Sequence, residues 1–165
     1  MAGSPGTLAP EAIGLICRLA EGPAELEAHF ALRRTVFAVE QKLFDGDDRD
    51  ERDRQPGTLH ALGLIAGEPC GAVRLYPLDA AGMQWKGDRL AVRSSARAQH
   101  LGAELVRFAV RTAGSRGGRL MIAHVQLANV RFFERLGWRA EGTPAPFHGV
   151  PHQLMSIPLR REEAA

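Results

Sequence analysis

One stretch, residues 90–105 (LAVRSSARAQHLGAEL), limits most strongly what this chain of 165 residues can fold into. An apolar run typical of a strand leads through a turn of small residues into a helical pattern over residues 103–113. The backbone N–H groups at the start of such a helix have no partner within it, and with the helix dipole they favour a bound anion. Arg93 and Arg97 add positive charge, so the stretch predicts a pyrophosphate site; a helix start solvated by water is the alternative.

The rest of the chain alternates short strands with helices. Strands are predicted over residues 13–20, 59–66, 70–78, 87–93, 120–124, 138–141 and 152–158. Helices are predicted over residues 24–41, 103–113 and 128–136, and a loop rich in Pro and Gly over residues 142–151. This order predicts an α/β fold of the α+β type, in which helices flank a sheet of mixed direction.

The composition, 45% apolar and 24% charged, is typical of one globular domain. We place this domain at residues 11–160, behind a flexible Gly/Pro/Ser-rich tail at residues 1–10. No apolar run approaches the roughly 18–20 residues that span a bilayer, and the N-terminus lacks the order of a signal peptide. We therefore expect a cytoplasmic protein with no membrane partner. The net charge of only +2, without aromatic residues among the basic ones, argues against a nucleic-acid partner.

Charge is distributed unevenly along the chain. Residues 45–54 hold six acids and three Arg, whereas residues 89–119 hold seven Arg and a single acid, Glu104. The first region suits a cation such as an amine substrate, although an acidic run is also typical of a solvated loop; the second suits an anion. We expect no metal, because the acidic run lacks EF-hand spacing. Cys17 and Cys70 lack zinc-ligand spacing as well, and we expect both to be buried apolar residues.

The segment after the predicted strand also carries a recognisable motif. Its six residues are, in order, Arg97, Ala98, Gln99, His100, Leu101 and Gly102. This order resembles R/Q-x-x-G-x-G/A, the acyl-CoA pyrophosphate loop of the GNAT superfamily of N-acetyltransferases, with His100 in place of the first glycine. Three further segments resemble the ElaA-like branch of that superfamily. They are LRRTVFAVEQ at residues 32–41, QLANVRFFERLGW at residues 126–138 and FHGVPHQLM at residues 147–155.

The resemblance covers about residues 24–158 and implies the GNAT fold. Its central sheet is mixed but mostly antiparallel, and two parallel strands, here near residues 88–93 and 120–124, splay apart to hold the pantetheine arm of acetyl-CoA. The amine is implied to enter over Glu40, the acidic run and residues 147–152. The acyl-CoA-binding residues that the resemblance implies are Leu90, Ala91, Val92, Arg97, Ala98, Gln99, His100, Leu101, Gly102, Ala103, Gln126, Phe132 and Phe133.

The reaction that the resemblance implies sets requirements for the catalytic groups. An ammonium must lose a proton before the amine attacks the thioester, and the oxyanion needs a donor, for which we expect the Val92 amide. Many members of the superfamily protonate the leaving thiolate with a Tyr, but the chain has Phe133 at that position, and we do not expect Tyr76, the only Tyr, to replace it.

Three residues are candidates for proton transfer, namely Glu40, His124 and His152, and His60 is considered with them. For each histidine the alternative is a structural role. For Glu40 the alternative is an ion pair with Arg33 or Lys42.

Two functions fit these observations. One is an N-acetyltransferase that moves acetyl from acetyl-CoA to a primary amine, of a small molecule, by direct attack. The other is an acyl-CoA-binding sensor or partner module with little or no turnover. His100 and Phe133 favour the module, whereas Arg97, Gly102 and Gln126 favour the enzyme. The acyl chain length, and whether the protein forms a homodimer, stay open.

Overall fold

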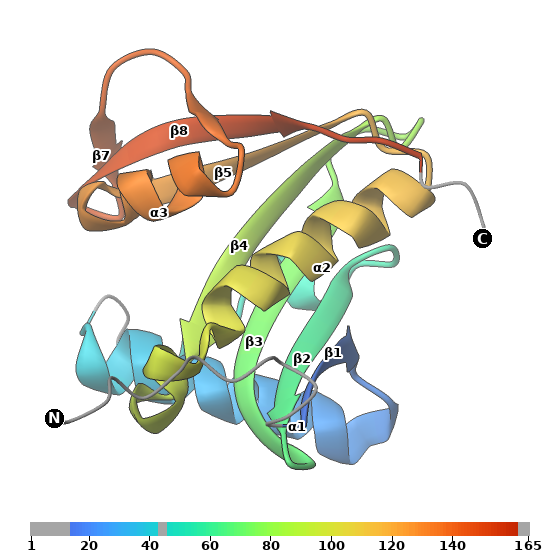
Figure 1. Ribbon diagram of the computed structural model, residues 1–165, viewed down its shortest axis with the longest axis vertical. Helices are drawn as coiled ribbons and strands as arrows, with labels where there is room; N and C mark the ends of the chain where they lie inside the picture. The colour runs from blue at the N-terminus through green and yellow to red at the C-terminus, as the bar shows by residue number, and fades with distance from the viewer. Residues whose placement is uncertain (1–13, 43–45, 162–165) are drawn as a thin grey trace, which may run out of the picture.

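The computed structural model describes residues 14–42 and 46–161, and a mixed eight-stranded sheet forms the centre of this part of the chain (Figure 1). The strand order is β1-β2-β3-β4-β5-β8-β6, with β7 paired to β8. Every pairing is antiparallel except that of β4 with β5. The strands are β1 (Leu15–Leu19), β2 (Leu59–Ile65), β3 (Glu68–Pro77), β4 (Gln84–Val92), β5 (Leu120–Gln126), β6 (Arg139–Ala140), β7 (Ala145–Phe147) and β8 (Val150–Pro158).

Helices cover both faces of the sheet. In Figure 1, α2 and α3 lie over one face and α1 crosses the other. The helices are α1 (Gly22–Arg33), the π-helix η2 (Arg34–Glu40), α2 (Leu101–Ser115), α3 (Val130–Arg135) and the short 3₁₀ helices η3 (Glu51–Arg54), η4 (Ser94–Gln99) and η5 (Leu127–Asn129). Within the described residues, none is long and apolar enough to cross a membrane.

The main core lies between the sheet and α2. Leu101 and Leu105 of α2 are fully buried against β2 and β3, where the sheet offers two glycines. A Cβ atom on Gly63 would lie 2.5 Å from Cδ1 of Leu101, and one on Gly71 would lie 2.7 Å from Cδ1 of Leu105. These glycines therefore let the helix approach the sheet closely.

The predicted fold class is confirmed, and the differences are local. The predicted helix over residues 24–41 divides at Arg34 into α1 and η2, because its last two turns take the wider π geometry. The predicted loop at 142–151 contains the short strand β7, which pairs with the first three residues of β8. Cys17 and Cys70 are both half-buried, not fully buried as expected. The predicted tail at residues 1–10 lies outside the described residues.

The acidic run folds back onto the α1 face of the sheet and forms a buried ionic cluster. Arg33, with a fully buried side chain, donates from Nε to Asp48 at 2.7 Å and from its two terminal nitrogens to Asp53 at 2.7 and 3.0 Å. Arg74, also buried, donates two hydrogen bonds of 2.7 Å to Asp88 and one of 2.6 Å to Asp50. We call Arg33, Asp48, Asp50, Asp53, His60, Arg74, Asp88 and Arg89 the ionic cluster.

The cluster corrects both interpretations of the acidic run. Asp48 is fully buried and Asp53 nearly so, so this part of the run is not a solvated loop. Its Asp48, Asp50 and Asp53 carboxylates are paired with arginines of α1, β3 and β4. An ion pair inside the fold cancels most of the field that attracts a distant cation, so these three carboxylates offer little free charge to an amine substrate.

The buried His29 is expected to make the free energy of unfolding fall as the solution becomes more acidic. Burial lowers the pKa of this histidine to about 3, while its Nε2–H donates to the Val73 carbonyl at 3.2 Å. As pH falls below about 6.5, His29 takes up a proton in the unfolded chain but stays neutral in the folded chain. The free energy of unfolding therefore falls by up to about 1.4 kcal/mol per pH unit. Urea unfolding between pH 7 and 4.5 measures this slope. His29→Gln is expected to be less pH-dependent; equal slopes in the two proteins would contradict the assignment.

Candidate active site

The two parallel strands β4 and β5 form a V-shaped gap, as the resemblance implied. They pair only at Gln84 with Leu120, Trp85 with Met121 and Lys86 with Ile122. Beyond this apex, β4 stays paired with β3, and β5 stays paired with β8. A bulge explains the divergence: the β3–β4 register shifts between Ala72 and Arg74, and Arg89 opposite takes a left-handed φ of 54°. An extra residue of this kind bends a strand and increases its twist.

Backbone groups of β4 face into the gap. The Arg93 amide donates to the Cys70 carbonyl of β3 at 2.8 Å. The residue before Arg93, Val92, therefore occupies a non-hydrogen-bonded position opposite Gly71. Its N–H and C=O therefore point away from β3. The Val92 carbonyl accepts a hydrogen bond from Nε of Arg97 at 3.2 Å, which agrees with this direction. A ligand lying in the gap can therefore pair with this edge like an added strand.

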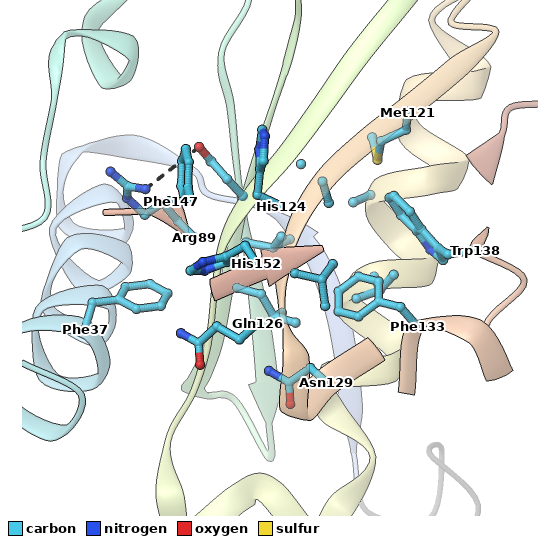
Figure 2. Close-up of a pocket in the computed structure, with 18 of the residues that line it drawn as sticks. Phe37, Arg89, Met121, His124, Gln126, Asn129, Phe133, Trp138, Phe147 and His152 are labelled. Carbon is cyan, nitrogen blue, oxygen red and sulfur yellow. Dashed lines mark ion pairs between the residues drawn. The ribbon is translucent and has the colours of Figure 1, made fainter. Parts of the chain in front are cut away.

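A pocket occupies the gap, and Figure 2 shows the residues that line it. Met121, Phe133 and Trp138 lie on one side of it, and Phe37, Arg89 and Phe147 on the other, with His124 and His152 between them. The lining residues are Phe37, Gln41, Val73, Gly87, Asp88, Arg89, Leu90, Val106, Ala109, Met121, Ala123, His124, Val125, Gln126, Asn129, Phe133, Trp138, Phe147, His148 and His152. The apolar walls and few polar groups are typical of a small-molecule site.

The mouth of the gap is formed by the segment that the sequence singled out. The 3₁₀ helix η4 ends at His100, whose φ of 61° turns the chain into α2. The Glu104 amide closes the first helical turn onto the His100 carbonyl at 3.2 Å, so the amides just before it point out of the helix end. The Arg97 guanidinium lies beside this end and pairs with Glu40. Neither of the partners expected for Glu40, Arg33 and Lys42, is the one observed.

The left-handed backbone of His100 gives a direct prediction. A residue with a side chain pays about 1–2 kcal/mol in this conformation, which glycine adopts freely. We therefore expect His100→Gly to raise the free energy of unfolding by about 1 kcal/mol, measured by urea denaturation, and to leave CoA affinity at least as high. Because the imidazole is exposed, no packing is lost. A destabilised or non-binding variant would show that the side chain itself is needed.

The pocket brings together some of the predicted acyl-CoA residues. Leu90, Gln126 and Phe133 line it, and Phe132 packs edge-on against Phe133 with ring centroids 5.4 Å apart. Ala91 is buried against Phe37. Arg97, His100, Gly102 and Ala103 lie at the start of α2 and do not line the pocket, and the Leu101 side chain is buried in the core; for Ala98 and Gln99 only the backbone belongs to the described structure.

The catalytic candidates separate into two groups. His124 and His152 line the pocket, whereas Glu40 lies at the mouth beside Arg97. His60 joins the ionic cluster, with Nε2 3.0 Å from Asp53. Tyr76 is buried with its hydroxyl 3.3 Å from Asp88, and burial raises its pKa to about 12.

The two pocket histidines differ in their surroundings. His152 is buried, and its Nδ1 lies 2.7 Å from the Val150 carbonyl; because a carbonyl only accepts, Nδ1 holds the proton and neutral Nε2 keeps a lone pair. His124 stacks on Phe147 with ring centroids 4.5 Å apart. Partial burial, and then the charges of Lys86 and His152, lower the pKa of His124, while Asp88 opposes them. His152 thus offers the lone pair of Nε2 to the pocket, and a histidine such as His124 can exchange a proton with a substrate.

Sequence reasoning missed several lining residues. Asp88 and Arg89 belong to the predicted strand at 87–93, but nothing local indicates that a bulge turns them toward the gap. Phe147 lies within the resemblance, yet only the pairing of β7 with β8 places its ring against His124. Lys86 does not itself line the pocket, but its Nζ lies 5.2 Å from the centre of the Phe147 ring, and this residue came just before the predicted strand.

Comparison with known proteins decides the family. The model of the Acetyltransferase (GNAT) family matches residues 26–138, more than half of the chain. The chain belongs to the GNAT family. This GNAT protein is therefore a member of a family of acetyltransferases, and the resemblance seen in its sequence is confirmed. One relative is the Bacillus subtilis (strain 168) protein named "Putative acetyltransferase BSU40680", 29% identical over 133 residues that cover 80% of this chain and 88% of that protein.

Solved structures share the fold of this GNAT protein. An acyl-CoA N-acyltransferase from Pseudomonas aeruginosa is 27% identical, with a TM-score of 0.68 over 86% of this chain and 97% of that one. ElaA from Escherichia coli is 21% identical, with a TM-score of 0.76 over 86% of this chain and 98% of that one. An aminoglycoside 6′-N-acetyltransferase complexed with coenzyme A is 17% identical, with a TM-score of 0.73 over 90% and 99% of the two chains.

Proposed function

We propose that this GNAT protein transfers an acetyl group from acetyl-CoA to a primary amine of a small molecule, by direct attack of the amine on the thioester. The pyrophosphate lies against the first amides of α2, beside Arg97. The pantetheine arm runs into the gap along Leu90–Val92, and the amine enters from the α1 face. The observation that supports this most is the pair of pocket histidines between the two sides of the gap.

The proposed steps follow from these groups. His152 Nε2, or His124 through a water molecule, takes a proton from the ammonium, and the neutral amine attacks the thioester carbon. The Val92 amide, which faces the gap, donates to the oxyanion. The carbon–sulfur bond then breaks, and the nitrogen, which gained a positive charge on attack, releases its extra proton to solvent to give the neutral amide. Because the Phe133 side chain has no acidic proton, it cannot protonate the leaving sulfur. CoA therefore leaves as the thiolate, which is a fair leaving group since an ordinary thiol has a pKa near 8.5.

The residues on the side of the pocket where the amine is proposed to enter limit the class of substrate. Among the residues that line the pocket, Asp88 is the acidic one, and its carboxylate is already held by two hydrogen bonds from Arg74. Phe37, Phe147 and three histidines supply most of the remaining surface on this side. Such a surface favours a compact amine with an apolar or aromatic body over a polycation. A cytoplasmic location is consistent with a supply of acetyl-CoA and stays a prediction.

A thiol-release assay with a panel of primary amines tests this function. We expect turnover with at least one compact amine and a rate that falls as pH drops below the pKa of the base, which for His124 lies under its ordinary value. Because general-base catalysis contributes about 10²–10⁴-fold, losing the responsible histidine in His124→Gln or His152→Gln lowers kcat by that order.

Binding of CoA to each variant, with an unchanged affinity, is the control. Acetyl-CoA binding without turnover of any amine would favour the alternative function, a sensor or partner module, which the replacement of the family's Tyr by Phe133 also suits.

A further inference from the structure

We propose that the site accepts acyl groups longer than acetyl, as an apolar chain of about three to five carbons that enters a chamber at the apex of the gap. This inference rests on the proposed function, because it places the same CoA in the same gap, and acetyl becomes the smallest group of the series. The residues that form the apex chamber are Gly87, Val106, Ala109, Met121, Phe133 and Trp138.

The apex chamber lies deeper than the reacting thioester. The pantetheine is proposed to run along Leu90–Val92 of β4, and Gly87 stands three residues beyond Leu90 toward the apex, about 10 Å along an extended strand. Met121, opposite Trp85 in the last β4–β5 pairs, closes the far end. A two-carbon acetyl group held beside Leu90–Val92 ends well short of Gly87, and each added carbon brings the chain nearer to the chamber.

The chamber walls are apolar and come from four elements. Val106 and Ala109 of α2 are 4% and 2% exposed, and Met121 of β5 is 1% exposed, yet all three face the pocket. Phe133 and Trp138 add aromatic walls, their rings edge-to-face with centroids 5.4 Å apart. The chamber thus offers a hydrocarbon chain the surroundings of a protein core, and each methylene buried there adds about fourfold to affinity.

Gly87 keeps the chamber open. Its φ is not in the left-handed region, so the backbone does not require glycine here. A Cβ atom at this position would lie 3.4 Å from Sδ of Met121 and within 4 Å of no other atom outside its chain neighbours, so a side chain here would point into the space in front of Met121. The absent side chain therefore leaves space between β4 and β5 where the two strands begin to separate.

Isothermal titration with CoA, acetyl-CoA and isovaleryl-CoA tests the chamber without a known acceptor. We expect all three to bind, and isovaleryl-CoA to bind at least fivefold more tightly than acetyl-CoA. Gly87→Val is expected to abolish this preference while CoA affinity stays within twofold. Ala109→Leu fills the chamber from α2 and gives the same result if Gly87→Val fails to fold. Val110→Leu, the matched control, adds a carbon at a neighbouring position of α2 that does not line the pocket, and keeps the preference.

The outcomes separate the two proposals. If CoA binds but isovaleryl-CoA binds no more tightly than acetyl-CoA, the chamber is wrong and the acetyl transfer stands. If the preference persists in both filled variants, the chain lies elsewhere and the chamber is again wrong. If none of the three ligands binds, the proposed function fails, and the chamber fails with it.

Discussion

Arg33→Met is expected to lower the free energy of unfolding by about 3–5 kcal/mol, because it removes the nearest counterion of two buried carboxylates. The Arg33 side chain is fully buried, and its partners Asp48 and Asp53 are 0% and 4% exposed. The pKa of Asp53 is held far below its usual range, chiefly by its hydrogen bonds with His60 and Arg33, against the cost of burial. Since a loss of this size is a large fraction of a typical domain's stability, we expect the variant to unfold at a much lower urea concentration.

Arg18→Met is the matched control for this prediction. Arg18 makes a two-pronged pair with Glu25, at 2.5 and 2.6 Å, but the two side chains are 34% and 28% exposed. Pairs that water reaches contribute about 0–1 kcal/mol, so this variant is expected to unfold close to the unaltered protein. Equal destabilisation by the two substitutions would show that the ionic cluster gives no special support to the fold.

Gly102→Glu is expected to weaken CoA binding by 100-fold or more. The substitution puts a carboxylate in the first turn of α2, where the proposed pyrophosphate lies, and like charges repel strongly in a partly dry site. The same carboxylate interacts favourably with the helix dipole, by about 0.3–1 kcal/mol, so the fold is expected to be as stable as before. Titration with CoA and urea denaturation, carried out on the same sample, separate these effects.

Gly102→Ala is the control that removes charge from this test. A Cβ atom here would lie 3.7 Å from Cζ of Phe132 and 3.7 Å from Cγ2 of Val92, ordinary contact distances. We expect its CoA affinity to stay within about threefold, because one methyl group leaves the helix end accessible. If the glutamate variant binds CoA as tightly as the alanine variant does, the anion does not lie at the start of α2.

The elements that could be predicted are those whose signal is local. The amphipathic pattern of α2 and the strand before it lie in one continuous stretch, and the motif at their junction has a fixed spacing. The V-shaped gap followed from the resemblance of four such segments. Each of these features depends on residues that are neighbours along the chain, so it can be predicted from the sequence without knowledge of the tertiary structure.

The features that escaped prediction depend on residues far apart in the sequence. Arg33 and Asp53 are separated by 20 positions, and Arg74 and Asp50 by 24, so no periodicity shows that an acidic run folds onto buried arginines. The bulge at Arg89 arises from the β3–β4 register, which the sequence of one strand does not specify. The pairing of Glu40 with Arg97 joins η2 to the mouth of the gap across 57 positions.

Titration of the purified protein with acetyl-CoA tests most directly the claim that the gap between β4 and β5 holds an acyl-CoA. We predict one-to-one binding with a dissociation constant in the micromolar range, about −8 kcal/mol, that is lost in Gly102→Glu. Absence of binding up to millimolar acetyl-CoA would contradict the account, because the start of α2 would then not hold the pyrophosphate on which both the enzyme and the alternative module depend.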